Sequence, residues 1–282
     1  MRRLAILLSA LGLSACAETA PERNPSDRPV RIVSLDYCAD QYVLEFADPE
    51  QVLAVSPDAA SDFSYHRDAA RGVPTVRPVA EDVLVLRPDL IVRAYGGGPG
   101  ATGFFERAGI PVLEVGWVSE LDGDGPGAIP SVLERMADGL GHPGRGAALS
   151  ETYRKRLAAL RDGSSSPAGP AALYMTPAGV TTGPGSLVHD MLVAAGLSNF
   201  QQVAGWHSLP LERLAYETPD LVAAAFYETL NTSPEGWSAS RHPIARAQLD
   251  AGPVVPLQGA WTACGGWFIL DAVEALAEGT PR

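Results

Sequence analysis

The feature that most constrains the fold is a short pattern that occurs twice, 131 residues apart. The first copy contains Glu81 and runs to Pro88-Asp89-Leu90, and the second contains Glu212 and runs to Pro219-Asp220-Leu221. Glu stands seven residues before Pro in both copies. A repeat at this distance predicts two lobes of similar structure, and two such lobes would enclose a ligand in the cleft between them.

Short strands and helices alternate on either side of a helical middle segment. Residues 129–140 and 147–160 have helical spacing, and no strand pattern interrupts them. The expected strands are 32–35, 52–56, 90–94, 111–115, 171–175, 221–225 and 254–257, and the expected helices outside the middle are 39–46, 81–86, 102–108, 187–195, 211–216 and 267–277. This alternation predicts an α/β protein of two Rossmann-like lobes, joined by a long connecting helix, with the ligand cleft between the lobes.

The first thirty residues predict export. Met1-Arg2-Arg3 and an apolar run that is too short to span a membrane are typical of a secretory signal. Leu13-Ser14-Ala15-Cys16 then resembles the cleavage box of bacterial lipoproteins, in which the cysteine carries lipid. We therefore expect a signal peptide at 1–15, lipid on Cys16, a tether over 16–30 and a periplasmic protein anchored through that lipid. The alternative is ordinary signal cleavage nearby, which leaves Cys16 as a spare thiol.

The rest of the chain is expected to divide into an N-terminal lobe over 31–128, connecting helices over 129–162 and a C-terminal lobe over 163–282.

The net charge of the protein is negative. Lys and Arg number 21 against 33 Asp and Glu, which gives a formal charge of −12. A protein that binds the nucleic-acid backbone must neutralise phosphates with basic clusters, so we exclude nucleic acid as a partner.

Enzyme signatures are incomplete. Gly98-Pro99-Gly100-Ala101-Thr102-Gly103 matches a dinucleotide-binding pattern, but Glu114 follows 11 residues later, whereas the ribose-binding acid is expected about 20 residues on. Ser186, His189 and Asp190 fall on one predicted helix, so they cannot converge as a catalytic triad. The histidines lack zinc-site spacing. We expect no enzyme, no catalytic residues, no resident cofactor and no dedicated metal site; a nucleotide-dependent oxidoreductase is the weaker alternative.

Several ordered motifs carry a family resemblance. They are Arg31 to Leu35, the two Glu-to-Pro-Asp-Leu repeats, Gly109 to Val112, Thr182 to Leu187, Ala195 to Asn199 and Val254 to Trp261. Over about residues 31–278 the chain resembles the helix-linked periplasmic binding proteins that serve ABC importers for vitamin B12, ferric siderophores and haem. The resemblance implies a monomer that binds a metal chelate between its lobes, closes by a small motion and delivers the chelate to a permease and its ATPase. The same fold could instead serve as a lipid-anchored scaffold or sensor without transport.

If ligands bind at the carboxyl ends of the strands, the loops there line the cleft. The candidate ligand-binding residues are Tyr37, Cys38, Tyr65, Tyr95, Trp206, His207 and Trp261. Aromatic rings of this kind suit the broad face of a corrin, a porphyrin or a siderophore chelate. The competing interpretation is that several of these rings belong to the core.

The ligand itself stays open among three classes. An anionic ferric siderophore would favour a cation such as Arg67, Arg77, Arg93 or Arg241. Haem would favour an axial ligand from Tyr65, His66 or His207. Cobalamin would need fewer charged side chains in the cleft than either of these ligands.

The repeated glutamates and the cysteines give further hypotheses. The resemblance implies that Glu81 and Glu212 meet arginines of the permease, and stabilisation of a helix N-terminus is the alternative role. Cys38 and Cys264 have three open roles: a disulfide across the lobes, two thiols facing the ligand, or two separate buried cysteines. Asp36 and Asp40 are expected to stabilise the start of a helix.

Overall fold

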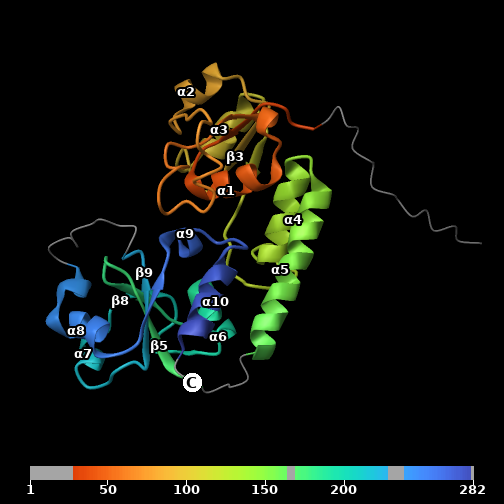
Figure 1. Cartoon of the computed structure of the whole chain (residues 1–282). Helices are drawn as coiled ribbons and strands as arrows, with labels where there is room; N and C mark the ends of the chain where they lie inside the picture. Colours follow the sequence, from red (N-terminus) through yellow and green to blue (C-terminus); the bar gives the residue numbers. More distant parts are fainter. Residues whose placement is uncertain (1–27, 164–168, 228–237, 281–282) are drawn as a thin grey trace, which may run out of the picture.

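The computed structural model describes residues 28–163, 169–227 and 238–280, which form two α/β lobes beside a pair of connecting helices (Figure 1). In the N-terminal lobe the elements are β1 (Ile32–Ser34), α1 (Tyr37–Phe46), β2 (Val52–Ala54), α2 (Ala80–Val85), β3 (Leu90–Arg93), α3 (Ala101–Arg107) and β4 (Val112–Glu114). The connecting helices are α4 (Ile129–Gly139) and α5 (Pro143–Gly163).

The C-terminal lobe repeats this plan and adds a small second sheet. Its elements are β5 (Ala171–Met175), β6 (Val180–Thr182), α6 (Leu187–Ala194), β7 (Ser198–Asn199), β8 (Trp206–Ser208), α7 (Leu211–Leu214), β9 (Leu221–Ala225), α8 (Pro243–Ala251), β10 (Val254–Leu257), α9 (Gly259–Thr262) and α10 (Ile269–Gly279). The predicted fold class, two Rossmann-like lobes with connecting helices, is confirmed.

Strand order confirms that the two lobes are copies of one plan. The first sheet runs β2-β1-β3-β4 and the second runs β7-β5-β9-β10, with parallel pairing in both. In each lobe the strand that follows the Pro-Asp-Leu motif lies beside the first strand of that lobe. Both faces of these sheets are covered, so the strands are almost continuously apolar.

The aspartate of each Pro-Asp-Leu motif fixes that pairing. The Asp89 carboxylate accepts hydrogen bonds from the backbone N–H groups of Val30 and Arg31, both at 3.0 Å, at the start of β1. Asp220 Oδ2 accepts one from the Ala171 N–H at 2.7 Å, at the start of β5. The repeat therefore encodes the same hydrogen bond twice, which aligns the two central strands of each sheet.

Helix α5 is held by both lobes. Arg145 donates to Asp48 Oδ1 at 2.6 Å and to the Phe46 carbonyl at 2.7 Å in the N-terminal lobe. Three turns later, Arg156 donates to Asp271 at 2.7 Å and to Glu274 at 2.6 Å on α10. The hydrogen bond from Arg156 holds the pKa of Glu274 below its usual range. One apolar cluster also runs from α1 through α4 and α5 to α10, so the connecting helices belong to a shared core.

Several elements were not predicted. Strands β6, β7 and β8 contain only two or three residues each, which is too few for an alternating pattern to be visible. Helices α8 and α9 were also missed, although His242 and Pro243 at the start of α8 are ordinary helix-start signals. Trp206 and His207, expected in a loop before a helix, lie on β8, which pairs antiparallel with β6.

Asp40 is a buried acid between α1 and the segment after β2. Its side chain is fully buried, Oδ1 accepts from the Ser56 N–H at 3.1 Å, and Oδ2 accepts from the Ser56 hydroxyl at 2.5 Å. Burial raises the pKa of Asp40 from 3.8 to about 6, because these hydrogen bonds only partly replace the lost hydration.

This pKa predicts a specific dependence of stability on pH. Between about pH 4 and pH 6 the unfolded chain has released the Asp40 proton and the folded chain still holds it. Raising the pH through this window therefore favours the unfolded state, by about 3 kcal/mol in total at about 1.4 kcal/mol per pKa unit. In Asp40→Asn the amide can still form hydrogen bonds with Ser56 but does not titrate, so the loss of stability between pH 4 and pH 6 should disappear.

Urea unfolding of both proteins at pH 4, 5, 6 and 8 measures the effect. The free energy of unfolding of Asp40→Asn, relative to the wild type, should rise over this range and then become constant. If the difference between the two proteins does not change with pH, the assignment to Asp40 is wrong.

Candidate ligand-binding site

A disulfide joins the two lobes. Cys38, in the first turn of α1, is bonded to Cys264, just after α9, with 5.5 Å between their Cα atoms and 226 residues between them in the chain. Beside the bridge, the Tyr42 hydroxyl donates to the Gly265 carbonyl at 2.9 Å. Since both cysteines are oxidised, neither offers a thiolate to a ligand metal, and Cys38 can contact a ligand only as part of the bridge.

Two of the predicted tyrosines lie together in the N-terminal lobe. Tyr37 follows β1 and Tyr95 follows β3, their ring centroids are 5.9 Å apart, and their hydroxyls are hydrogen-bonded to each other. Phe63 packs edge-on against Tyr37 at 4.8 Å. Burial raises the pKa of both phenols above the usual range, so they are neutral at physiological pH. The three rings form an aromatic surface at the carboxyl ends of β1 and β3.

Asp36 holds this pair in place. Its side chain is only 3% exposed, and Oδ1 accepts from the Ala39 N–H at 3.0 Å as the N-cap of α1, which confirms the predicted helix-start role. Oδ2 accepts from three successive N–H groups, those of Ala94, Tyr95 and Gly96, at 2.8–3.0 Å. One carboxylate therefore fixes the backbone that carries Tyr95 against the helix that carries Tyr37.

The glycine-rich segment after Tyr95 is a structural turn. Buried Arg93 donates to the carbonyls of Gly96 and Gly98 at 2.9 and 3.1 Å and forms an ion pair of 2.9 Å with Glu114. Glu114 is thus occupied, which removes it as a ribose-binding acid, and Arg93 is neutralised, so it does not serve as an unpaired cation for an anionic chelate. Gly96 has no space for a side chain, because a Cβ there would lie 2.3 Å from the Leu35 carbonyl oxygen.

Tyr65 lies at the contact between the lobes. Its ring stacks on Phe268 with 4.7 Å between centroids, and its hydroxyl is hydrogen-bonded to Asp271 of α10. Burial and the negative charge of Asp271 raise the pKa of Tyr65 to about 12. Its neighbour His66 is 3.0 Å from Glu45 in its own lobe. The structure thus uses Tyr65 for packing between the lobes.

The C-terminal lobe contributes Trp206, His207 and Trp261. Trp206 on β8 is half exposed and packs edge-on against buried Tyr174 at 6.2 Å. His207 Nε2 lies 2.8 Å from the Ala204 carbonyl oxygen. Trp261, on α9 three residues before Cys264, is partly buried against the shared core. Only Trp206 of these three has both a large exposed surface and a ring fixed from behind.

Sequence reasoning missed Trp117. It follows β4 as Tyr95 follows β3, and its side chain is 79% exposed. The adjacent Val118 is in close contact with Gly265, where a Cβ would lie 2.5 Å from the valine Cβ. Trp117 therefore lies near the boundary of the lobes, and its position just after a strand was the signal that could have identified it.

The remaining candidates divide between structural roles and surface positions. Ser186 accepts from the His189 N–H at 3.1 Å as the N-cap of α6, which is a helix-start role. Glu81 and Glu212 are both exposed, each is the second residue of a helix (α2 and α7), and each lies nine residues before a strand, β3 or β9. Cys16 lies outside the described residues.

Two further findings concern the described ranges alone. Within residues 28–163, 169–227 and 238–280, no group of three or more His, Cys, Asp or Glu side chains is placed to hold a metal ion. In the same ranges no helix has the length and apolar character needed to cross a membrane.

Comparison of this structure with solved structures decides the fold family. A periplasmic heme-binding protein from Roseiflexus sp. RS-1 superposes with a TM-score of 0.66 at 21% sequence identity, covering 88% of this chain and 98% of the other. A periplasmic vitamin B12-binding protein of Vibrio cholerae has a TM-score of 0.64 at 20% identity, with 89% and 96% covered. The chain has the fold of the periplasmic binding proteins.

A possible iron-binding, periplasmic solute-binding protein from Staphylococcus epidermidis ATCC 12228 superposes equally well, with a TM-score of 0.66 at 15% identity over 90% of this chain and 99% of the other. No family model matches the sequence, and the search of curated proteins found no match. The resemblance expected from the sequence motifs is thus confirmed by the fold.

The disulfide leads to a prediction about stability. Removing it in Cys38→Ala/Cys264→Ala, in a protein of residues 17–282, should lower the free energy of unfolding by about 3–5 kcal/mol, because the bridge constrains a very long loop in the unfolded chain. Urea unfolding measures the loss. A thiol count on the oxidised, unfolded parent protein is the control and should give zero free thiols; a count of two would contradict the bridge.

Proposed function

We propose that the protein captures one metal chelate, of the cobalamin, ferric siderophore or haem class, between its lobes and delivers it to the permease and ATPase of an ABC importer. The observation that carries this proposal is the duplicated parallel sheet, joined by α4 and α5, with aromatic side chains after the strands of the N-terminal lobe and on β8 of the C-terminal lobe. Proteins of the same fold are described as binding heme or vitamin B12.

The side chains favour a ligand with a broad apolar face and little negative charge. Tyr37, Tyr95 and Trp206 supply large rings, and the phenols stay neutral because their pKa values are raised. Two of the four candidate cations are already neutralised, Arg93 by Glu114 and Arg77 by Asp82. A corrin, whose side chains are largely neutral amides, therefore fits this site better than a strongly anionic siderophore.

Export and anchoring complete the proposal. The residues before 28 carry the signal and lipoprotein motifs, with Cys16 as the lipid acceptor. The described chain begins at Arg28, which forms an ion pair of 2.9 Å with Asp48 in the N-terminal lobe. The protein acts as a monomer held to the membrane through this lipid alone.

Ligand capture is tested by titration of purified residues 17–282 with cyanocobalamin, hemin and a ferric siderophore. We expect one site of micromolar affinity or tighter, about 8 kcal/mol or more. Trp206→Ala and Trp261→Ala should each weaken binding by about 1–3 kcal/mol if the ring is buried against the ligand. Phe104→Ala, which alters an exposed ring on α3, is the control and should bind normally.

Calorimetry and absorbance spectra record binding, and native mass spectrometry of the protein as isolated identifies any ligand already present. Absence of heat, spectral change and bound mass with all three probes would refute capture. Recovery of a non-transporter partner with no small molecule bound would favour the scaffold alternative.

Docking is tested by Glu81→Lys/Glu212→Lys. Both side chains are exposed surface groups, so ligand affinity should stay within about twofold of the wild type while uptake of the chelate by cells falls to background. Uptake of radiolabelled ligand measures the effect, and Glu106→Lys/Glu278→Lys, at other exposed positions, is the charge-matched control. Normal uptake in the double variant would leave both glutamates with a structural role only.

A further inference from the structure

The three rings of the aromatic surface stand steeply to one another. Phe63 and Tyr95 both pack against Tyr37, with ring centroids 4.8 and 5.9 Å away and interplanar angles of 70° and 71°. An edge-on contact covers at most one face of the two rings that form it, and Tyr95 is 52% exposed, so ring faces remain open to a ligand.

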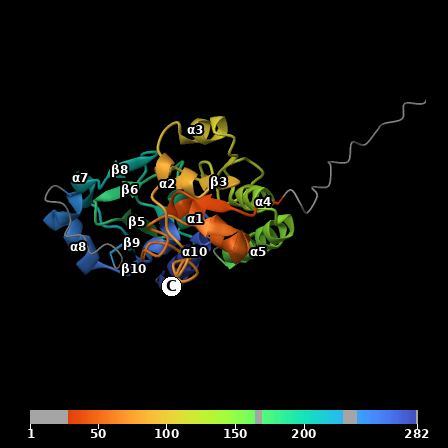
Figure 2. The same ribbon diagram turned by 90° about the horizontal axis from the view of Figure 1, so that it is seen from above.

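This surface lies beside the boundary of the lobes. Seen from above, α1, whose first residue is Tyr37, lies over α10 of the C-terminal lobe (Figure 2). Cys38, the next residue, is bonded to Cys264 of that lobe. A ligand held between the lobes can therefore reach the open ring faces.

The segment that carries Asp58 and Phe63 is tied to α1 both before and after these two residues. Before them, the N–H and hydroxyl groups of Ser56 donate to the buried carboxylate of Asp40 at 3.1 and 2.5 Å. After them, Ser64 Oγ accepts a hydrogen bond of 2.9 Å from the buried glutamine of α1. The ring and the acid are thus held over the start of the helix that carries the central tyrosine.

The charges that act on this surface are negative. Burial raises the pKa of the Tyr37 and Tyr95 phenols, and the negative charges of Asp36 and Asp58 raise it further. Asp36 lies behind the pair and accepts from the Tyr95 N–H at 3.0 Å. Asp58 is exposed, and among the described residues it forms no ion pair. One carboxylate therefore stands behind the rings, and a second is free to meet a ligand.

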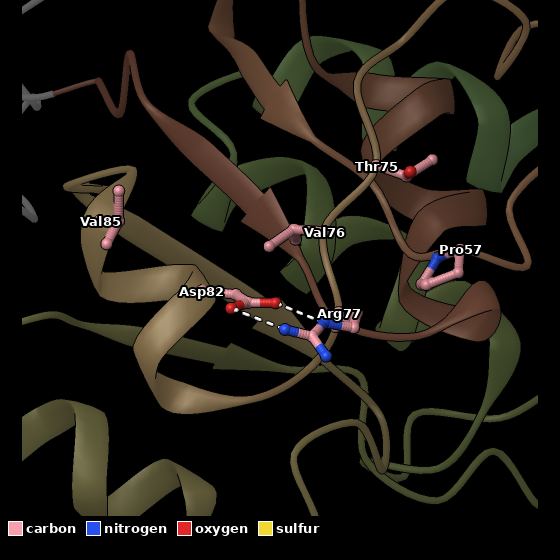
Figure 3. A pocket seen from close by; sticks show the side chains of 6 residues that line it. All are labelled: Pro57, Thr75, Val76, Arg77, Asp82 and Val85. Carbon is pink, nitrogen blue, oxygen red and sulfur yellow. Dashed lines mark hydrogen bonds and ion pairs between the residues drawn. The ribbon is translucent and has the colours of Figure 1, made fainter.

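The nearby arginines are directed to other partners. Pro57, directly before Asp58, lines a shallow depression of about 530 Å³ together with Arg77 and Asp82. Figure 3 shows that Arg77 is bound to Asp82 there, through hydrogen bonds of 2.6 and 3.2 Å. Arg67 donates to a backbone carbonyl of its own loop at 3.5 Å. Neither arginine is among the main charges that shift the pKa of the two phenols.

We propose that the aromatic surface recognises positive charge, and that the captured ligand is a chelate of net positive charge that lies against Phe63 and Tyr95 with the Asp58 carboxylate beside it. The choice of chelate rests on the proposed function. A cation is attracted both by the face of an aromatic ring and by a carboxylate next to it, and an anion is repelled by both. The formal charge of −12 also draws a cation toward the protein.

The first test compares choline with 3,3-dimethylbutan-1-ol, which has the same shape but no charge. Both are titrated by NMR into purified, oxidised protein of residues 17–282. We expect choline to bind at least fivefold more tightly. The ratio of the two affinities reports the effect of charge, because damage to the site weakens both probes. A smaller ratio, or no binding of either probe, would overturn the inference.

Two variants assign the preference to the carboxylate and to a ring. Asp58→Asn removes the charge at constant size, and Phe63→Leu keeps apolar bulk without a ring face, so each should lower the ratio at least threefold. Asp250→Asn, at an exposed position on α8, removes the same charge elsewhere and should leave the ratio unchanged. Thermal unfolding shows that the variants fold. An equal fall in Asp250→Asn would reduce the preference to net charge and overturn the site.

Two chelates of one class test the ligand. Aquacobalamin is a cation at pH 6, cyanocobalamin is neutral, and the two have the same corrin and side chains. We expect at least fivefold tighter binding of aquacobalamin, with a smaller preference in Asp58→Asn and at high salt. The absorbance spectrum shows whether a protein group has replaced the axial water. If the preference is absent, or if it persists unchanged in Asp58→Asn, the assignment to this surface is wrong.

Failure of the charge recognition and failure of the proposed function give different results. If choline is preferred and the preference depends on Asp58 and Phe63, but no chelate binds, the cation-recognising surface stands and capture of a chelate is wrong. If a chelate binds without regard to its charge and choline is not preferred, capture stands and the inference drawn from this surface is wrong.

Discussion

The relative position of the two lobes is fixed by two ties, and the placement of the aromatic residues of one lobe relative to those of the other depends on it. One tie is covalent, the Cys38–Cys264 disulfide between α1 and the segment after α9. The other is α5, which Arg145 fastens to the N-terminal lobe and Arg156 to the C-terminal lobe. Tyr65 of the N-terminal lobe also stacks on Phe268 of the C-terminal lobe. Rotation of one lobe against the other must therefore break polar and apolar contacts together. Large closure of one lobe onto the other is therefore disfavoured, and a ligand of the proposed class would enter through local movement of loops.

A site on so rigid a frame can be arranged before the ligand arrives. Asp36 accepts four hydrogen bonds from backbone N–H groups, which sets the distance between the segments that carry Tyr37 and Tyr95. Arg93 then fixes the turn that follows. If these rings contact the proposed ligand, they would lose little freedom on binding, which would preserve affinity. The buried polar groups behind the rings thus serve the site as much as the fold.

The sequence predicted the parts of this structure that depend on periodicity and repetition. Strands β5, β9 and β10 have the predicted bounds, because each is a fully apolar run between turn residues. The sequence could not predict that Tyr65 packs between the lobes. Its stacking on Phe268 joins residues about 200 positions apart and leaves no local pattern. Trp117 was missed for a related reason: exposure of an aromatic side chain is a property of the folded surface. The pairing of Cys38 with Cys264 also stayed one of three alternatives. The number of residues between two cysteines does not show whether the fold brings them together across the lobes.

The distribution of conserved and divergent features between the two lobes bears on function. On the outer surface the repeat is retained: each lobe has an exposed glutamate, an apolar residue one turn later and an aspartate that aligns its central strands. At the carboxyl ends of the strands the repeat is kept only in part. Tyr95 after β3 and Phe226 after β9 stand 131 residues apart, as the two glutamates do, but Tyr37 has no aromatic counterpart in the segment directly after β5. A surface that meets two copies of one partner gains from staying alike, and a pocket that holds one ligand without symmetry gains from becoming different. In the proposed function the duplicated fold would separate two tasks in space, with docking on the outer surface that keeps the repeat and recognition at the strand ends, where the repeat is kept only in part.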